Sequence, residues 1–346
     1  MDIRPQHLQD AVDHGIINPQ QAEALWQLWQ TQNRHVPQFR MSHVLYYLGG
    51  LIAIGAMSLF MNLGWEHFGG GAIVALCVVY GIAALALTEY FGRKNLLIPA
   101  GLTAAFGVVL VPLAVYGAQQ ALGLWPDDWH YRDYHRWADW RWVMMELATL
   151  AAAALMLWRY RYPFLMLPLA VTLWYVSMDA AEWWLLADTG FASMEFKYRV
   201  SMVFGLAMLA LAVWIDFRNH SRRDFPFWLY IFGTLTFWCG LTFLDSDSEW
   251  AKFVYFLINV TLVFAGVLLR RRVLAVFGAM GMFGYGWYLA DKIFKDSWLF
   301  PIALTLLGLV MVGIGVWWQK NEARLNRQLR QAMPKPIREF LERKAV

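Results

Sequence analysis

The stretch GAIVALCVVYGIAALALTEYFGRKNLLIPAGLTAAFGVVLVPLAVYGAQQ, residues 71–120, decides the fold of this chain. It consists of two apolar runs joined by a short polar segment that carries Arg93 and Lys94. A helix needs about 20 apolar residues to cross the hydrocarbon core of a bilayer, and each run has about this length. Because lipid offers no hydrogen-bond partners to the backbone, such runs form helices that satisfy their own amides. The stretch therefore predicts a transmembrane helical hairpin.

The same pattern extends along most of the chain. Hydrophobic residues make up 59% of the 346 positions and charged residues only 16%, which leaves too few polar residues to cover a soluble protein. The alternating pattern of an outer-membrane barrel is absent. About ten spans are expected, at 43–63, 71–91, 96–121, 142–159, 163–185, 199–217, 226–244, 251–269, 272–291 and 298–318. We therefore predict an all-α, polytopic membrane helical bundle.

The chain divides into three regions by composition. Residues 1–42 form a polar head, residues 43–318 a membrane block of about ten helices, and residues 319–346 a basic tail. No cleavable signal peptide is expected, because the first apolar run begins only after Ser42, a candidate N-cap. The first span is therefore predicted to serve as its own insertion signal.

The head is predicted to be a cytoplasmic helical hairpin. Gly15 suits a helix C-cap, and Asn18 followed by Pro19 suits the N-cap and first position of a second helix. Gln21 stands at the position that completes a capping box with Asn18. A pair of helices this small is not stable alone. Residues 1–34 are therefore expected to pack on the membrane block, on a second copy of the chain or on another protein.

The distribution of lysine and arginine predicts the orientation. Basic residues concentrate in alternate joints, whereas the opposite joints are acidic, and cytoplasmic loops of membrane proteins carry the excess of positive charge. The basic joints hold Arg93 and Lys94, Arg159 and Arg161, Arg218, Arg222 and Arg223, and Arg270, Arg271 and Arg272. An even number of spans then leaves both termini in the cytoplasm. We predict a multi-pass protein of a bacterial inner membrane.

Two segments near the N-terminus carry a resemblance to a known family. HGIINPQQAEALWQLW, residues 14–29, is followed after a linker by the first span YYLGGLIAIGAMSLFMNLGW, residues 46–65. Together they resemble a family of predicted bacterial multi-pass membrane proteins of unknown function, which pairs an N-terminal helical hairpin with hydrophobic spans. The resemblance covers roughly the first 120 residues. It implies the architecture and assigns no catalytic residue.

Carboxylates near the outer boundary are the first candidates for a site. Glu146, Asp179 and Glu182 lie within about one helical turn of that boundary, and Asp179 and Glu182 share a helix face. They can share a proton or hold a cation; alternatively, they are hydrated groups at the rim. In a weak internal repeat, three outward spans each end in an aspartate: Asp179, Asp245 and Asp291. This pattern indicates either a ring of carboxylates at the outer boundary or only the effect of the charge rule on each span.

The longest outer joint, WPDDWHYRDYHRWADWRW, residues 125–142, offers a second candidate site. His130, Asp133 and His135 have the side chains that bind divalent metals. No fixed ligand spacing accompanies them, and five tryptophans favour instead an amphipathic segment at the membrane surface. Recognition of a sugar or of a lipid headgroup is a third alternative.

Glycines concentrate in the first and ninth expected spans. Gly49, Gly50 and Gly55 lie in the first, and Gly278, Gly281 and Gly284 in the ninth. Such residues allow helices to approach closely in lipid. Alternatively, they mark a locally unwound helix beside a substrate path, which Pro112 and Pro168 would also support. The polar residues Gln119, Gln120 and Asn259 are expected to form hydrogen bonds between helices.

The basic tail predicts an amphipathic helix on the cytoplasmic leaflet. Arg324, Arg327 and Arg330 lie beside a stripe of apolar residues, so anionic lipids of the inner leaflet are the expected partners. No nucleic-acid motif accompanies the net charge of +4. The two cysteines, Cys77 and Cys239, fall inside expected spans and form no zinc motif. No cofactor is expected.

Three classes of function follow from this pattern. Many spans with short joints favour a transporter or a permease for lipids or small molecules. Span centres without charge, together with two cytoplasmic appendages, favour a non-catalytic sensor or scaffold that binds partners through the head and tail. A membrane-embedded enzyme acting on a lipid-linked substrate is the third class and would use the outer histidines and aspartates. No motif of a known catalytic class is present, and no catalytic residue is predicted.

Overall fold

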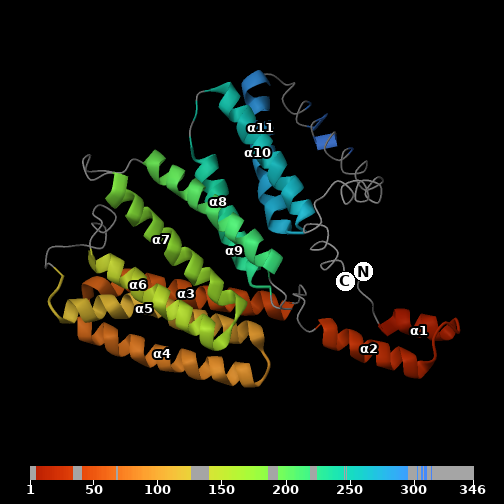
Figure 1. The fold of residues 1–346 in the computed structure, drawn as a ribbon, viewed down its shortest axis with the longest axis horizontal. Coiled ribbons are helices and arrows are strands. Elements are labelled where there is room, and N and C mark those ends of the chain that lie inside the picture. The colour runs from red at the N-terminus through yellow and green to blue at the C-terminus, as the bar shows by residue number, and fades with distance from the viewer. Residues whose placement is uncertain are drawn as a thin grey trace.

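The computed structural model describes residues 5–33, 41–67, 69–125, 140–185, 194–218, 224–244, 246, 248–294 and six isolated positions between 302 and 313. These residues are helical and contain no strand (Figure 1). The elements are α1 (Pro5–Asp13), α2 (Pro19–Asn33), α3 (Met41–His67), α4 (Gly70–Arg93), α5 (Leu97–Ala121), α6 (Trp140–Tyr160), the 3-10 helix η2 (Pro163–Leu165), α7 (Met166–Leu185), α8 (Met194–Arg218), α9 (Pro226–Thr242), α10 (Glu249–Leu268) and α11 (Arg272–Phe294).

Six helical segments are long and apolar enough to cross a membrane: α4, α5, α6, the continuous stretch Pro163–Trp183, α8 and α10. The prediction of an all-α membrane bundle is thereby confirmed. Helices α3, α9 and α11 coincide with three further expected spans, and the tenth, 298–318, falls almost entirely outside the described residues. Ten spans therefore stay a prediction.

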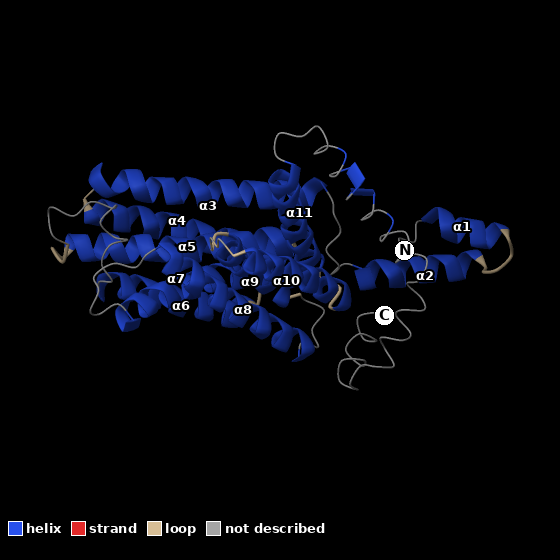
Figure 2. Cartoon of the chain, turned by 90° about the horizontal axis from the view of Figure 1, so that it is seen from above, coloured by secondary structure: helices blue, strands red, loops and turns tan. Residues whose placement is uncertain are grey.

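Helices that follow one another pack as hairpins, notably α4 with α5, α8 with α9 and α10 with α11. Figure 2 shows α3 to α7 lying alongside each other, with α10 and α11 to one side. The turn after α4 contains Asn95 at φ 56°, and the Leu96 amide donates to the Phe91 carbonyl over 2.9 Å, as in a Schellman motif. Arg270, after α10, has φ 55°. We call the end of the bundle with these turns the basic end and the opposite end the acidic end.

Glycines allow α8 and α9 to pack at backbone contact. A Cβ at Gly205 would overlap the backbone of Phe237, and one at Gly240 would lie 2.6 Å from the Tyr198 carbonyl oxygen. Sequence reasoning missed these glycines, because they are spread along two spans and form no cluster. Of the two alternatives for the spans, α5 does not support local unwinding at Pro112, because the helix continues through this proline.

The head forms the expected hairpin, which Figure 1 shows beside the bundle. Gly15 ends α1 at φ 67°, and α2 begins at Pro19. The Gln21 amide donates to Asn18 Oδ1 over 2.7 Å, and the Asn18 amide donates to Gln21 Oε1 over 3.0 Å. The predicted capping box is confirmed. Ser42 is not an N-cap, because α3 already begins at Met41. What the head packs against stays a prediction.

Candidate functional site

Glu146 is a buried carboxyl group at the acidic end of the bundle. It lies in the second turn of α6, on the buried face that also holds Trp142 and Met145, and only 7% of the residue is exposed. Its Oε1 atom has no hydrogen-bond partner. A carboxylate buried in this way loses hydration without receiving an ion pair in return, which destabilises its charged form.

Two further carboxylates from α7 and a lysine from α8 lie at the same end of the bundle as Glu146. Asp179 is close enough to Glu146, Glu182 and Lys197 for their charges to interact. Glu182 Oε1 lies 3.0 Å from Lys197 Nζ, and these side chains are 19% and 31% exposed. We call Glu146, Asp179, Glu182 and Lys197 the acidic cluster. The fold thus brings together the three carboxylates expected near the outer boundary and adds a lysine that the sequence did not single out.

The acidic cluster differs from a metal site. Among the residues that the structure describes, no group of three histidine, cysteine, aspartate or glutamate side chains is placed to hold a metal ion. The predicted metal candidates His130, Asp133 and His135 lie outside the described residues, as does Asp245. Asp291 is exposed near the end of α11 and does not belong to the acidic cluster.

One face of α8 connects the acidic cluster with the basic end. From Lys197 the buried side of the helix continues through Ser201 and Gly205 to Ala212 and Asp216. The middle of this face carries only small or apolar groups, whereas both its ends carry charge. Ser201 accepts a hydrogen bond from the Trp174 indole of α7 over 3.2 Å. An apolar stretch of this α8 face therefore lies between the acidic cluster and the charged Asp216 at the basic end.

Arg271 organises a buried ion cluster at the basic end. Its Nη2 lies 2.9 Å from Asp216 Oδ1, and its Nη1 lies 2.5 Å from Asp224 Oδ2. The Tyr230 hydroxyl donates to Asp216 over 3.3 Å, and the guanidinium lies 4.8 Å from the centre of the Tyr230 ring. This cluster joins the α8–α9 hairpin to the turn between α10 and α11.

The charge of Arg271 is well compensated. Burial alone would lower the pKa of Arg271, but hydrogen bonds to Asp224 and Asp216 and the charges of both carboxylates outweigh it and raise the pKa. The sequence predicted Arg271 only as a basic joint residue. Sequence reasoning missed Asp216 and Asp224. The available signal was that these two acidic residues flank the joint of Arg218, Arg222 and Arg223, where the charge rule leads one to expect basic residues.

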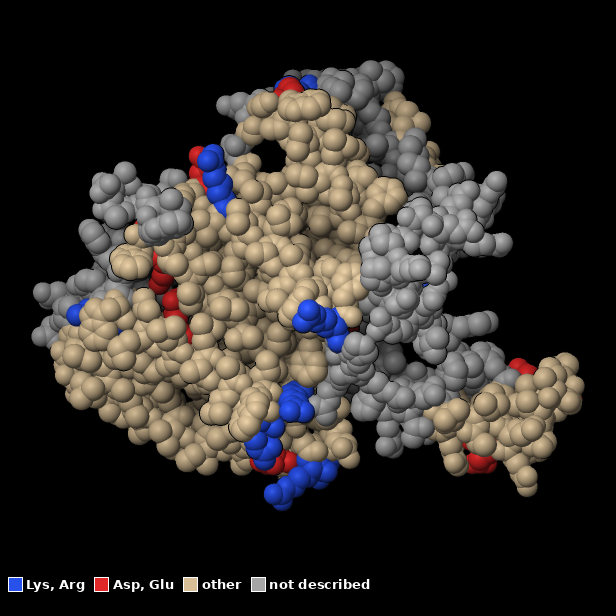
Figure 3. Space-filling view, viewed as in Figure 1, with Lys and Arg blue, Asp and Glu red and all other residues tan. Residues whose placement is uncertain are grey.

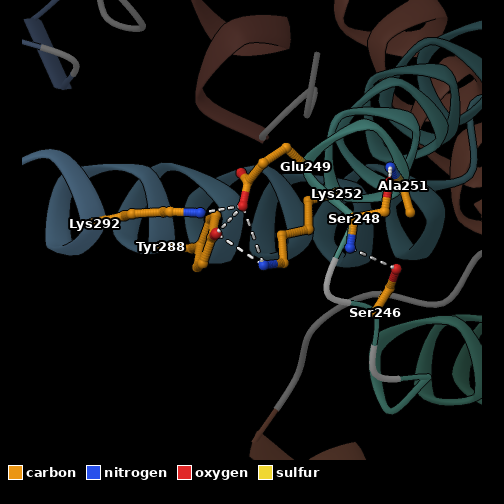
Figure 4. A network of polar contacts seen from close by, with 7 residues as sticks. All are labelled: Ser246, Ser248, Glu249, Ala251, Lys252, Tyr288 and Lys292. Atoms are coloured by element: carbon orange, nitrogen blue, oxygen red, sulfur yellow. Dashed lines mark hydrogen bonds and ion pairs between the residues drawn. The ribbon is translucent and has the colours of Figure 1, made fainter.

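A polar network at the acidic end of α10 and α11 is satisfied within itself (Figure 4). Lys252 Nζ donates to the Tyr288 hydroxyl over 2.8 Å, and that hydroxyl donates to Glu249 over 2.9 Å. Lys292 also pairs with Glu249. Ser248 caps α10 by accepting a hydrogen bond from the Ala251 amide over 3.4 Å. Half or more of the Glu249 and Lys292 side chains is exposed. We therefore interpret the network as a surface contact that joins α10 to α11.

The predicted glycines fall into two groups. A Cβ at Gly278 would lie 2.6 Å from the Asn259 carbonyl oxygen, and one at Gly281 would overlap the Asn259 side chain. A Cβ at Gly50 would lie 2.7 Å from the end of the Leu102 side chain. Around Gly49, Gly55 and Gly284, a Cβ would meet nothing within 4 Å in the described part of the chain. Of the six glycines predicted from the sequence, Gly50, Gly278 and Gly281 therefore lie at close helix contacts.

Two of the three expected interhelical hydrogen bonds are confirmed. Asn259 of α10 accepts from the Trp238 indole of α9 over 3.1 Å. Gln119 of α5 donates to the Arg141 carbonyl of α6 over 3.2 Å. Gln120 differs, because its buried Oε1 has no partner. The first bond positions α10 against α9, and the second positions α6, which carries Glu146, against α5.

Comparison with protein-family models, with curated proteins and with solved structures finds no match. The resemblance of the head and first span to a family of unknown function stays a prediction. The predicted tail residues Arg324, Arg327 and Arg330 lie outside the described residues. A functional proposal for this chain therefore draws on the chemistry of its buried groups.

Proposed function

We propose that this chain is a proton-linked transporter and that the acidic cluster carries the proton. The observation that supports this proposal is Glu146, a buried carboxyl group in a membrane helix with an unpartnered oxygen and a second carboxylate, Asp179, close by. Ionisable groups within membrane spans are energetically expensive, and those that persist mark pathways for ions or protons.

The chemistry of the cluster favours a proton over a metal ion. Two neighbouring carboxylates repel each other when both are ionised, and one shared proton removes this repulsion. A metal ion would need several oxygen ligands converging on one point, an arrangement that the described residues lack. Lys197 pairs with Glu182 and its charge also acts on Asp179, whereas Glu146 interacts with Asp179 and pairs with no cation in the described part of the chain, so we assign the proton to Glu146 with Asp179 as its neighbour.

The position of the cluster suits exchange with one aqueous side. Glu146 lies near the start of α6, and Asp179 and Glu182 lie in the last turns of α7, so all three are close to the acidic end. The apolar middle of α8 then separates the proton site from the basic end. A transport cycle requires such a barrier, because a continuous polar path would leak protons.

The proposed setting is a bacterial inner membrane with both termini in the cytoplasm. The charge rule supports this orientation, since it assigns the turns with Arg93, Arg159 and Arg270 to the cytoplasmic side. The acidic cluster would then face the periplasm, where the proton concentration is held higher. A substrate carried with the proton would enter from the same side.

Proton flux in proteoliposomes tests the proposal. The full chain is reconstituted with a trapped pH-sensitive dye, a potassium potential is imposed with valinomycin, and acidification is followed with and without a panel of candidate substrates. Replacing Glu146 with Gln should reduce the flux about tenfold or more, because the amide keeps the shape and cannot exchange a proton.

Glu195→Gln is the matched control, since Glu195 lies on α8 in an exposed pair with Arg199 and is 58% exposed. This variant should transport as the unmodified chain does. Equal fluxes in the Glu146→Gln variant and the unmodified chain would exclude the acidic cluster as the proton carrier. A chain that moves no protons with any substrate would contradict proton linkage altogether.

A further inference from the structure

A basic surface lies where α4 and α6 end, away from the acidic cluster. Arg93, Lys94, Arg159 and Arg161 are all exposed there. Glu89 faces them from the last turns of α4, 3.5 Å from Arg159, and it also accepts a hydrogen bond from the Tyr160 hydroxyl over 3.0 Å. Figure 3 shows basic side chains gathered over this part of the molecule. In the described part of the chain, these residues place four positive charges on this surface, and Glu89 contributes one negative charge.

An open groove on this surface is lined by four consecutive residues where α6 ends. Trp158, Arg159, Tyr160 and Arg161 line a cavity of about 410 Å³. Arg161 has a left-handed backbone, φ 53°, which reverses the chain between α6 and η2 and is unusual for a residue other than glycine. The Arg159 guanidinium lies 5.0 Å from the centre of the Tyr160 ring. The groove therefore combines two guanidinium groups with aromatic walls.

The groove lies at the level expected of lipid headgroups. It follows the last turn of a helix that is long and apolar enough to cross the membrane, so its depth is that of the membrane surface. Trp158 is 73% exposed beside the arginines, and exposed indoles are typical of this interface. Trp214, at the end of α8 that also lies at the basic end, is 50% exposed. Both tryptophans lie at the basic end, as interfacial indoles do.

We propose that the groove binds the phosphate headgroup of an anionic phospholipid. Guanidinium groups bind phosphate through paired hydrogen bonds, which explains why arginines rather than lysines line the groove. The indole of Trp158 offers an apolar surface for the glycerol and upper acyl carbons, which a free phosphate ion would leave unused. The site is independent of the acidic cluster and does not depend on proton transport.

Native mass spectrometry of the full chain in detergent tests this site. The protein is titrated with phosphatidylglycerol and, in parallel, with phosphatidylcholine of the same acyl chains. The unmodified chain should bind phosphatidylglycerol more tightly. The Arg159→Gln/Arg161→Gln variant should bind it about tenfold more weakly or worse, since each basic residue at a membrane surface contributes about 1 kcal/mol.

Arg199→Gln is the matched control, because Arg199 is an exposed arginine, 65% exposed, near the acidic end. It should bind as the unmodified chain does, and a double variant that also keeps full affinity overturns the proposal. If the double variant aggregates, the single variants Arg159→Gln and Arg161→Gln replace it, and unchanged affinity in both overturns the proposal. Displacement of the lipid by millimolar inorganic phosphate or glycerol phosphate would overturn the lipid assignment in favour of a soluble phosphate, whereas retention of the lipid supports it.

Discussion

Arg271 holds both carboxylate oxygens of Asp216, a residue 55 positions earlier in the chain, through Nε at 3.2 Å and Nη2 at 2.9 Å. The pair is buried, with side chains that are 10% and 5% exposed. Asp224 binds the guanidinium from a second side, so two carboxylates share this one cation. Because the contact joins two separate hairpins, it fixes how α10 and α11 sit against α8 and α9.

Replacing Arg271 with Gln should destabilise the protein strongly. The change removes the Arg271 charge from the buried Asp216 carboxylate, and breaking a buried pair from one side costs about 3–5 kcal/mol. Thermal unfolding in detergent should show a clear drop in the midpoint. Arg272→Gln is the control, because Arg272 is the exposed neighbour at the start of α11 and should change the midpoint little. Similar midpoints for both variants would contradict the assigned role.

Replacing Gly281 with Ala should disturb the contact between α10 and α11. The added methyl group would overlap the Asn259 side chain, which already accepts a hydrogen bond from Trp238. Overpacking of this kind costs about 1–3 kcal/mol. Gly284→Ala, on the same helix with open space around it, should be neutral or slightly stabilising. The Gly281→Ala variant should therefore unfold at a lower temperature than the Gly284→Ala variant. Equal changes of the unfolding midpoint in both variants would refute the packing argument.

The acidic cluster predicts an order of effects on proton flux. Glu146→Gln should slow the flux most, because Glu146 is the buried group without a cation partner. Asp179→Asn should follow, since it removes the neighbouring carboxylate. Glu182→Gln should have the smallest effect, because Lys197 already balances Glu182. Initial rates of dye acidification measure the order, and a dominant effect of Glu182→Gln would reverse the proposed roles.

The capping box predicts a local effect in the head. Asn18→Ala removes the acceptor for the Gln21 amide, and loss of an N-cap costs about 1 kcal/mol of helix stability. Amides in the first turn of α2 should then exchange with deuterium several times faster. Gln20→Ala, at an exposed position that makes no capping contact in the described head, should leave their exchange unchanged. Equal exchange in both variants would show that the cap contributes nothing.

Local patterns were enough to predict several features of the chain. The expected spans at 71–91 and 96–121 match α4 and α5 within two residues, and the Asn18–Gln21 capping box is present. Glu146, Asp179 and Glu182 were singled out because charge near a span boundary is visible in the sequence. The partners of these groups were not visible, because Lys197 reaches Glu182 from another helix.

The sequence by itself determined that lipid is the solvent for most of this protein, because hydrophobic run length and backbone hydrogen bonding act within one segment. It also determined the approximate extent of the helices, since caps and turns involve neighbouring residues, although α3 begins before Ser42 and α8 begins at Met194 rather than at 199. Only the tertiary structure decided that Arg271 pairs with Asp216, that Gly281 faces Asn259 and that Asp179 is close enough to Glu146 for their charges to interact. These relationships join residues on different helices, and they exist only once helix packing has selected which faces meet.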